Sequence, residues 1–121
     1  MVRQSLVLGT AALAGLAIGS IVAVPTQGAP EPVIRVMAER YHYIPDLITL
    51  RKGKPVVFEL ISLDRVHGFK VPDLGIRADV SPDKPIQVRV TPQATGRFTF
   101  LCDVFCGSDH EEMNGLIVVE D

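Results

Sequence analysis

Residues 102–115 read CDVFCGSDHEEMNG and place four side chains with metal-binding atoms in one short stretch. Both cysteines of the chain, Cys102 and Cys106, are followed by His110 and Met113, which gives the spacing C-x3-C-x3-H-x2-M. Such a stretch can form a disulfide in an exported protein, bind zinc through thiolates and imidazoles, or bind copper. A thioether is a soft ligand that suits copper and that zinc does not need. Met113 therefore favours copper, although methionine also commonly fills gaps in a core.

A second histidine, His67, lies in LDRVHGFKVPDLGIRAD (63–79), next to Gly68, which allows another backbone segment to pack closely. With His110 it supplies the two imidazoles that a mononuclear blue copper site takes together with one thiolate and a weak axial methionine. Two cysteines and two histidines would equally make a tetrahedral zinc site. The loop offers two thiolates, however, and a single blue copper ion leaves the second one unexplained.

Strands are the elements that must hold these residues. The segments 56–62, 86–91, 97–102 and 115–120 are rich in β-branched or aromatic residues, and weaker strand patterns cover 33–40, 47–51, 65–71 and 75–80. No segment after residue 32 sustains a helical period, and prolines and glycines punctuate the chain at short intervals. This pattern predicts an all-β antiparallel sandwich or barrel. The metal-binding loop then joins the last two strands, at the rim of a rigid sheet that holds ligands well.

The N-terminal segment has a different composition. Residues 5–24 carry no charge and follow Arg3, and they are long enough to cross a bilayer of about 30 Å as one helix. We therefore expect a membrane anchor or a cleaved signal peptide over 1–24, a proline-rich linker over 25–32 and the folded domain over 33–121. Arg3 favours a cytoplasmic N-terminus. The domain is then extracytoplasmic, either anchored or released to the periplasm after cleavage.

The charge pattern excludes some partners. The net charge is −2 and no basic run is present, which argues against nucleic acid. After Arg97 the chain has six acidic residues and no lysine or arginine; these carboxylates either keep an exposed end solvated or contact a basic partner. The third histidine, His42, stands between two tyrosines and is expected at the surface or at a strand edge. No nucleophile or general base is evident, so no catalysis is expected from this chain alone.

Two stretches together, HGFKVPDLGIRAD (67–79) and CDVFCGSDHEEMNGLIVV (102–119), resemble the cupredoxin domain of cytochrome c oxidase subunit II. The resemblance covers about residues 33–121 and implies a cupredoxin-like Greek-key β-sandwich or barrel, preceded by one N-terminal hydrophobic helix. It also implies the binuclear copper centre of that family, called CuA, with two copper ions. The implied ligands are His67, Cys102, the backbone carbonyl of Val104, Cys106, His110 and Met113.

The resemblance assigns a role to each ligand. Both cysteines bridge the two ions; His67 and Met113 complete one copper, and His110 and the Val104 carbonyl complete the other. Asp64 matches an acidic position of the family that orients His67. Burial by four phenylalanines is expected to exclude water from the site, namely Phe69, Phe98, Phe100 and Phe105.

The function implied is one-electron transfer, in a respiratory oxidase or as an anchored electron shuttle. Implied partners are a c-type cytochrome as donor, an oxidase catalytic subunit, a copper-delivery protein and the membrane. Three departures place the chain nearer the short bacterial members or a free-standing relative: Val104 where many members have glutamate, Phe69 where tryptophan is frequent, and room for one membrane helix rather than two. An extracytoplasmic copper carrier or storage protein, and a mononuclear copper or zinc structural domain, remain open alternatives.

Overall fold

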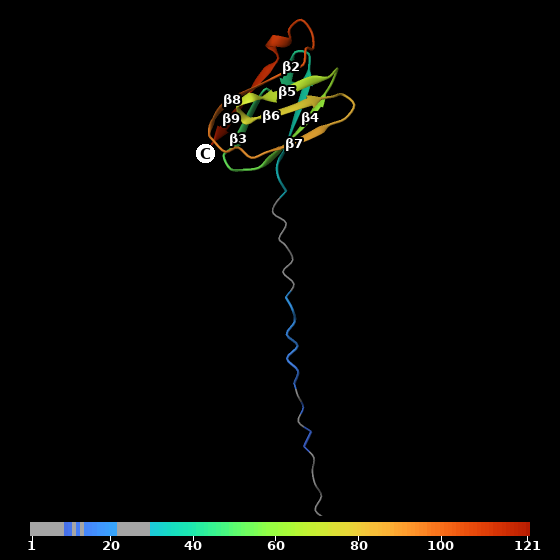
Figure 1. The fold of residues 1–121 in the computed structure, drawn as a ribbon, viewed down its shortest axis with the longest axis vertical. Coiled ribbons are helices and arrows are strands. Elements are labelled where there is room, and N and C mark those ends of the chain that lie inside the picture. The colour runs from blue at the N-terminus through green and yellow to red at the C-terminus, as the bar shows by residue number, and fades with distance from the viewer. Residues whose placement is uncertain (1–8, 11, 13, 22–29) are drawn as a thin grey trace, which may run out of the picture.

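The computed structural model describes residues 9, 10, 12, 14–21 and 30–121 (Figure 1). Its folded part holds all eight predicted strands, with shifts of one or two residues at their ends, and one further short strand at residues 42–44. In chain order the elements are β1 (Val33–Glu39), β2 (His42–Ile44), β3 (Leu47–Arg51), β4 (Val56–Ser62), β5 (His67–Val71), η1 (Pro72–Leu74), β6 (Ile76–Val80), β7 (Ile86–Val90), β8 (Gly96–Leu101), η2 (His110–Glu112) and β9 (Asn114–Glu120).

The strands form two sheets, in the orders β2-β1-β4-β7 and β3-β9-β8-β5-β6. Successive strands repeatedly cross from one sheet to the other, which is the connectivity of a sandwich rather than of one hairpin meander. The expectation of a purely antiparallel arrangement is wrong, because β1 pairs with β4 and β3 pairs with β9 in parallel. A parallel pair requires a crossover between its strands, and here the crossovers run through the opposite sheet.

The core lies between the two sheets. On β4 every second residue is buried, from Val56 through Phe58 and Leu60 to Ser62, as a strand with one core-facing side requires. Phe58 belongs to an aromatic cluster in which neighbouring ring centroids lie 5.0–6.1 Å apart, formed by Tyr43, Phe58, Phe69 and Phe100. Such tilted and edge-on ring pairs stabilise the interior beyond simple burial.

Three strands bring the candidate ligands to one end of the domain. Strand β8 ends at Leu101, directly before Cys102, and β9 begins at Asn114, directly after Met113. Strand β5 begins at His67 and is antiparallel to β8, with Lys70 opposite Leu101. Residues 102–113 form the ligand loop. Continuing this register places the first residues of β5 beside the first residues of this loop.

The predicted N-terminal helix lies partly outside the described residues. Residues 9, 10, 12 and 14–21 carry no helix or strand. Within the described ranges there is no helix with the length and apolar composition needed to span a membrane.

Candidate metal centre

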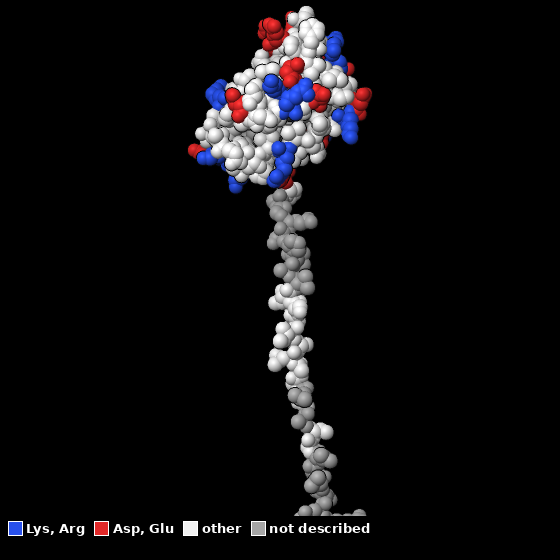
Figure 2. All heavy atoms as spheres, in the orientation of Figure 1, with Lys and Arg blue, Asp and Glu red and all other residues white. Residues whose placement is uncertain are grey.

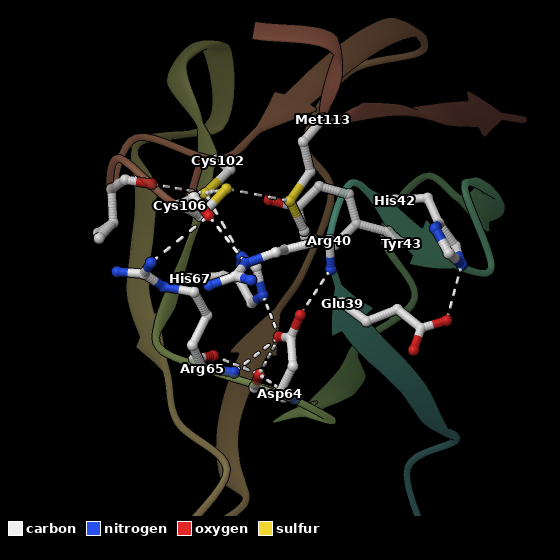
Figure 3. A network of polar contacts seen from close by, with 12 residues as sticks. Glu39, Arg40, His42, Tyr43, Asp64, Arg65, His67, Cys102, Cys106 and Met113 are labelled. Atoms are coloured by element: carbon white, nitrogen blue, oxygen red, sulfur yellow. Dashed lines mark hydrogen bonds and ion pairs between the residues drawn. The ribbon is translucent and has the colours of Figure 1, made fainter. Parts of the chain in front are cut away.

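The ligand loop holds two free thiols, those of Cys102 and Cys106 (Figure 3). Cys102 is 3% exposed and Cys106 is fully buried, and their Sγ atoms are 4.0 Å apart. A disulfide has a sulfur–sulfur distance of about 2.05 Å, so the two side chains are not bonded to each other. Two buried thiols facing one another present two sulfur donors to a common point.

The two ring nitrogens of His67 face opposite neighbours, Asp64 on one side and Cys102 on the other. The ring is fully buried, Nε2 lies 2.6 Å from Oδ1 of Asp64, and Nδ1 lies 4.0 Å from Sγ of Cys102. A carboxylate on one ring nitrogen sets the tautomer and leaves the other nitrogen as a donor to a metal. Asp64 therefore orients His67 toward the thiols.

His110 and Met113 approach the other thiol. Nδ1 of His110 lies 3.6 Å from Sγ of Cys106, and Sδ of Met113, a residue only 1% exposed, lies 3.9 Å from the same sulfur. Both side chains are placed by η2, whose turn is closed by the Met113 N–H donating to the His110 carbonyl. Each sulfur thus has an imidazole of its own.

Among the described residues, the ligand atoms that lie within 4.8 Å of one another belong to His67, Cys102 and Cys106, and this group does not include His110. The backbone carbonyl of Val104 also faces the centre, because the Cys102 thiol donates to it at 3.1 Å. The structure therefore brings all six predicted ligand residues to one end of the domain.

His42 is apart from them, on the edge strand β2 and paired with Glu39 at 3.0 Å, as predicted for a surface histidine.

The side of the loop next to Cys102 is packed against β5. The Gly68 N–H donates to Sγ of Cys102 at 3.3 Å, and a Cβ at Gly68 would lie 1.9 Å from Oδ1 of Asp103. Two nitrogens of Arg77 on β6 donate to the two oxygens of Asp103, at 2.9 and 3.1 Å. This pair lowers the pKa of Asp103, against the opposing effect of burial. The close packing expected next to His67 is confirmed. The ion pair between Asp103 and Arg77, which holds this side of the loop, was not predicted from the sequence.

The donor set fits a metal cation. Burial, and next the neighbouring Cys102, raise the pKa of Cys106 to about 11, so the thiol keeps its proton unless a positive charge replaces it. A metal ion provides that charge, because thiolate rather than thiol is the ligand. Two sulfurs, two imidazole nitrogens and a thioether are a soft donor set that suits copper.

The phenylalanines divide into two groups. Phe69 and Phe100 are fully buried in the aromatic cluster, and Phe98 is partly buried against the core. Phe105 is 72% exposed, so the expectation that it shields the site from water is wrong. It stands at the tip of the ligand loop, between two residues that turn inward, and its ring centroid lies 5.8 Å from that of His110.

Tyr43 is a further residue of the site that sequence reasoning missed. Its hydroxyl donates to the Gly68 carbonyl at 2.6 Å, and the side chain is 2% exposed. Burial raises its pKa, and the nearby cysteines raise it further. Figure 2 shows a group of carboxylates at the top of the domain, where Figure 1 places η2, which carries Glu111 and Glu112; lysine or arginine side chains lie close by.

The fold and this group of donors define a cupredoxin. Residues 11–119 match the family model described as a cupredoxin-like domain. Over 99 residues, or 82% of this chain, the sequence is 33% identical to a cytochrome c oxidase subunit 2 of Thermus thermophilus and covers 73% of that protein. It covers 59% of a second T. thermophilus subunit 2 at the same identity. The chain belongs to the cupredoxin-like family of cytochrome c oxidase subunit 2.

Solved structures share this fold. The periplasmic domain of subunit II of cytochrome oxidase from Bradyrhizobium japonicum superimposes with a TM-score of 0.69 at 18% identity, covering 76% of this chain and 87% of that one. The metal binding domain of the Streptococcus pneumoniae Cu(I) exporting P-type ATPase superimposes with a TM-score of 0.57 at 27% identity, covering 74% and 85%. The family and the buried His67, Cys102 and Cys106 together support copper binding and copper-based electron transfer.

Proposed function

We propose that this chain transfers electrons one at a time through a binuclear copper centre. It acts either as a subunit 2-like component of a respiratory oxidase or as an electron shuttle held at the membrane by residues 1–24. The proposed ligands are His67, Cys102, the carbonyl of Val104, Cys106, His110 and Met113. One observation carries this proposal: two buried thiols lie 4.0 Å apart, and each has an imidazole Nδ1 within 4.0 Å of its sulfur.

The placement of the two histidines supports two ions rather than one. Zinc or copper bound by sulfur and nitrogen lies about 2.0–2.3 Å from each ligand, so the ligands of one tetrahedral ion lie within roughly 4 Å of each other. The ligand atoms of His67 and both cysteines lie within 4.8 Å of one another, and His110 lies outside this group while approaching Cys106. Two ions held between the thiolates would use both histidines.

When bound, a copper pair would supply the one-electron chemistry, and Cys102 and Cys106 would be the thiolates that hold both ions. The chain keeps its ligands in place: Asp64 fixes the ring of His67, and the Gly68 N–H holds the Cys102 sulfur. Strands β5, β8 and β9 anchor both ends of the loop. Ligands that do not move make little structural change necessary when the charge changes. The buried aromatic cluster excludes water from the interior, which helps to set the potential.

The partners proposed follow from this function. A c-type cytochrome donates electrons, and the acidic surface of η2 offers it a complementary charge when its own surface is basic. An oxidase catalytic subunit accepts the electron in the first arrangement. A copper-delivery protein loads the site, which faces the periplasmic or extracytoplasmic side.

A cysteine variant and an electron-transfer assay test the function. Cys106→Ser removes one bridging sulfur at nearly constant size, so we expect lower copper content and a changed absorption spectrum. We also expect the copper-loaded chain to oxidise a reduced c-type cytochrome in stopped-flow mixing. Full copper content with an unaltered spectrum in the variant would contradict the bridged centre, and the absence of electron transfer from any c-type cytochrome would contradict the proposed donor.

A copper carrier is the second candidate, because the Cu(I) exporter's metal binding domain shares this fold at 27% identity. A carrier must release its metal readily. Competition with a copper chelator distinguishes the two: an electron-transfer centre retains its copper over many turnovers of oxidation and reduction, and a carrier loses it to the chelator within the mixing time.

A further inference from the structure

Two arginines from outside the ligand loop contact its backbone at the Cys106 carbonyl (Figure 3). Nε of Arg40, which directly follows β1, donates to this carbonyl at 3.0 Å. The guanidinium of Arg65, in the connection between β4 and β5, lies 3.5 Å from the same carbonyl and 3.5 Å from that of Phe105. Arg40 therefore makes the main contact, and Arg65 adds a longer one.

The same two arginines are tied to the residue that orients His67. Asp64 accepts the backbone N–H of Arg40 at 2.8 Å and that of Arg65 at 2.7 Å, and it accepts from the His67 ring at 2.6 Å. Although burial opposes it, these hydrogen bonds together lower the pKa of Asp64. One cluster, Arg40–Asp64–Arg65, thus connects the ligand on β5 with the ligand at the tip of the loop.

The charge of these arginines is directed at the loop. Arg35, Arg77 and Arg89 each form an ion pair with a carboxylate. Within the described part of the chain, neither the Arg40 nor the Arg65 guanidinium forms one. Their positive charges face the carbonyls next to the Cys106 thiol instead. A hydrogen bond from a charged donor is stronger than one between neutral groups.

We propose that Arg40 and Arg65 are positioning residues for the metal centre, which hold Cys106 at a fixed place relative to His67 and raise the reduction potential by their charge. The first part concerns the metal-free protein, and the second rests on the proposed function. A nearby positive charge favours the state with the extra electron, so removing it lowers the potential. Arg40 makes the larger contribution to positioning, because its contact is the shorter one.

The test uses the full chain with Arg40→Gln, Arg65→Gln and Arg40→Lys, and with Arg89→Gln as the matched control. Arg89 is an exposed arginine on the edge strand β7 and pairs with Glu31, away from the ligand loop. In the metal-free protein, amide hydrogen exchange is followed by NMR at His110 and Met113, whose N–H groups donate to carbonyls inside the loop. Loss of the charged hydrogen bond in Arg40→Gln should speed this exchange about tenfold.

The copper-loaded proteins provide the second readout. We expect a lower reduction potential in Arg40→Gln and Arg65→Gln, an unchanged potential in Arg89→Gln, and a potential close to that of the parent chain in Arg40→Lys, which keeps the charge. If Arg40→Gln has the same amide exchange rates in the loop and the same reduction potential as Arg89→Gln, the inference is overturned. The exchange experiment needs no metal, so it tests the positioning role even if the parent chain fails to bind two copper ions.

Discussion

Replacing Gly68 with alanine tests whether the contact between β5 and the ligand loop determines the position of Cys102. The added Cβ would lie 1.9 Å from Oδ1 of Asp103 and 2.9 Å from its backbone nitrogen, whereas ordinary contacts begin at 3.4 Å. The carboxylate must therefore move by about 1.5 Å, the difference between 3.4 and 1.9 Å. The carboxylate then loses its two hydrogen bonds with Arg77. The backbone nitrogen of Asp103 must also shift by about half an ångström.

We expect Gly68→Ala to lower the free energy of unfolding by about 1–3 kcal/mol, the usual cost of overpacking a close contact. The lost ion pair adds little, because the Arg77 and Asp103 side chains are 43% and 23% exposed. Since the Gly68 N–H also holds the Cys102 sulfur, the copper-loaded variant should show an altered absorption spectrum as well. Urea denaturation measures the first effect, and titration with copper measures the second.

Asp103→Ala provides the control for this prediction. It removes the carboxylate that the new methyl group meets, so Gly68→Ala should cost less in the Asp103→Ala background than in the parent chain. Equal unfolding free energies and identical spectra for the parent chain and Gly68→Ala would refute the claim that this contact sets the position of the loop.

Three further predictions concern residues of the same site. Met113→Leu conserves volume and should change the unfolding free energy by less than about 1.5 kcal/mol. It should nevertheless change the absorption spectrum and the reduction potential of the copper-loaded chain. An unchanged spectrum would show that Met113 only packs in the core and does not bind the metal. Tyr43→Phe leaves the buried Gly68 carbonyl without its donor and should cost about 1–3 kcal/mol in urea denaturation; no loss of stability would refute that hydrogen bond. The pKa of Asp103 is lowered by Arg77, so its contribution to stability is present above its unfolded pKa of about 3.9 and is lost as the pH falls through the lower folded pKa. Asp103→Asn should therefore lose less stability on acidification below about pH 4 than the parent chain, and equal losses would contradict the pairing.

The strands could be predicted because their signal is local. Alternating apolar residues and frequent turn residues marked eight of them, and β4 shows the expected burial at every second position. The strand β2 has only three residues, too few for a periodic pattern. The parallel pairing of β1 with β4 was not predictable, since it depends on which sheet each strand joins rather than on its own composition.

The ligand residues could be predicted for a different reason. Cysteine, histidine and methionine at fixed spacing carry their chemistry in their identity, so the loop was recognisable without knowledge of its conformation. Arg40 and Arg65 carry no such mark, because an arginine in a loop is usually a solvated charge. Phe105 shows the opposite error: an aromatic residue between two ligands looks like a shield, but the backbone turns it outward while Val104 and Cys106 face the centre.

The binuclear copper centre can be tested by measuring the ratio of copper to chain in the reconstituted protein together with its electron paramagnetic resonance spectrum. We expect two copper ions per chain and hyperfine structure from an electron shared equally between two nuclei. One copper ion per chain, or hyperfine structure from a single nucleus, would contradict the binuclear centre.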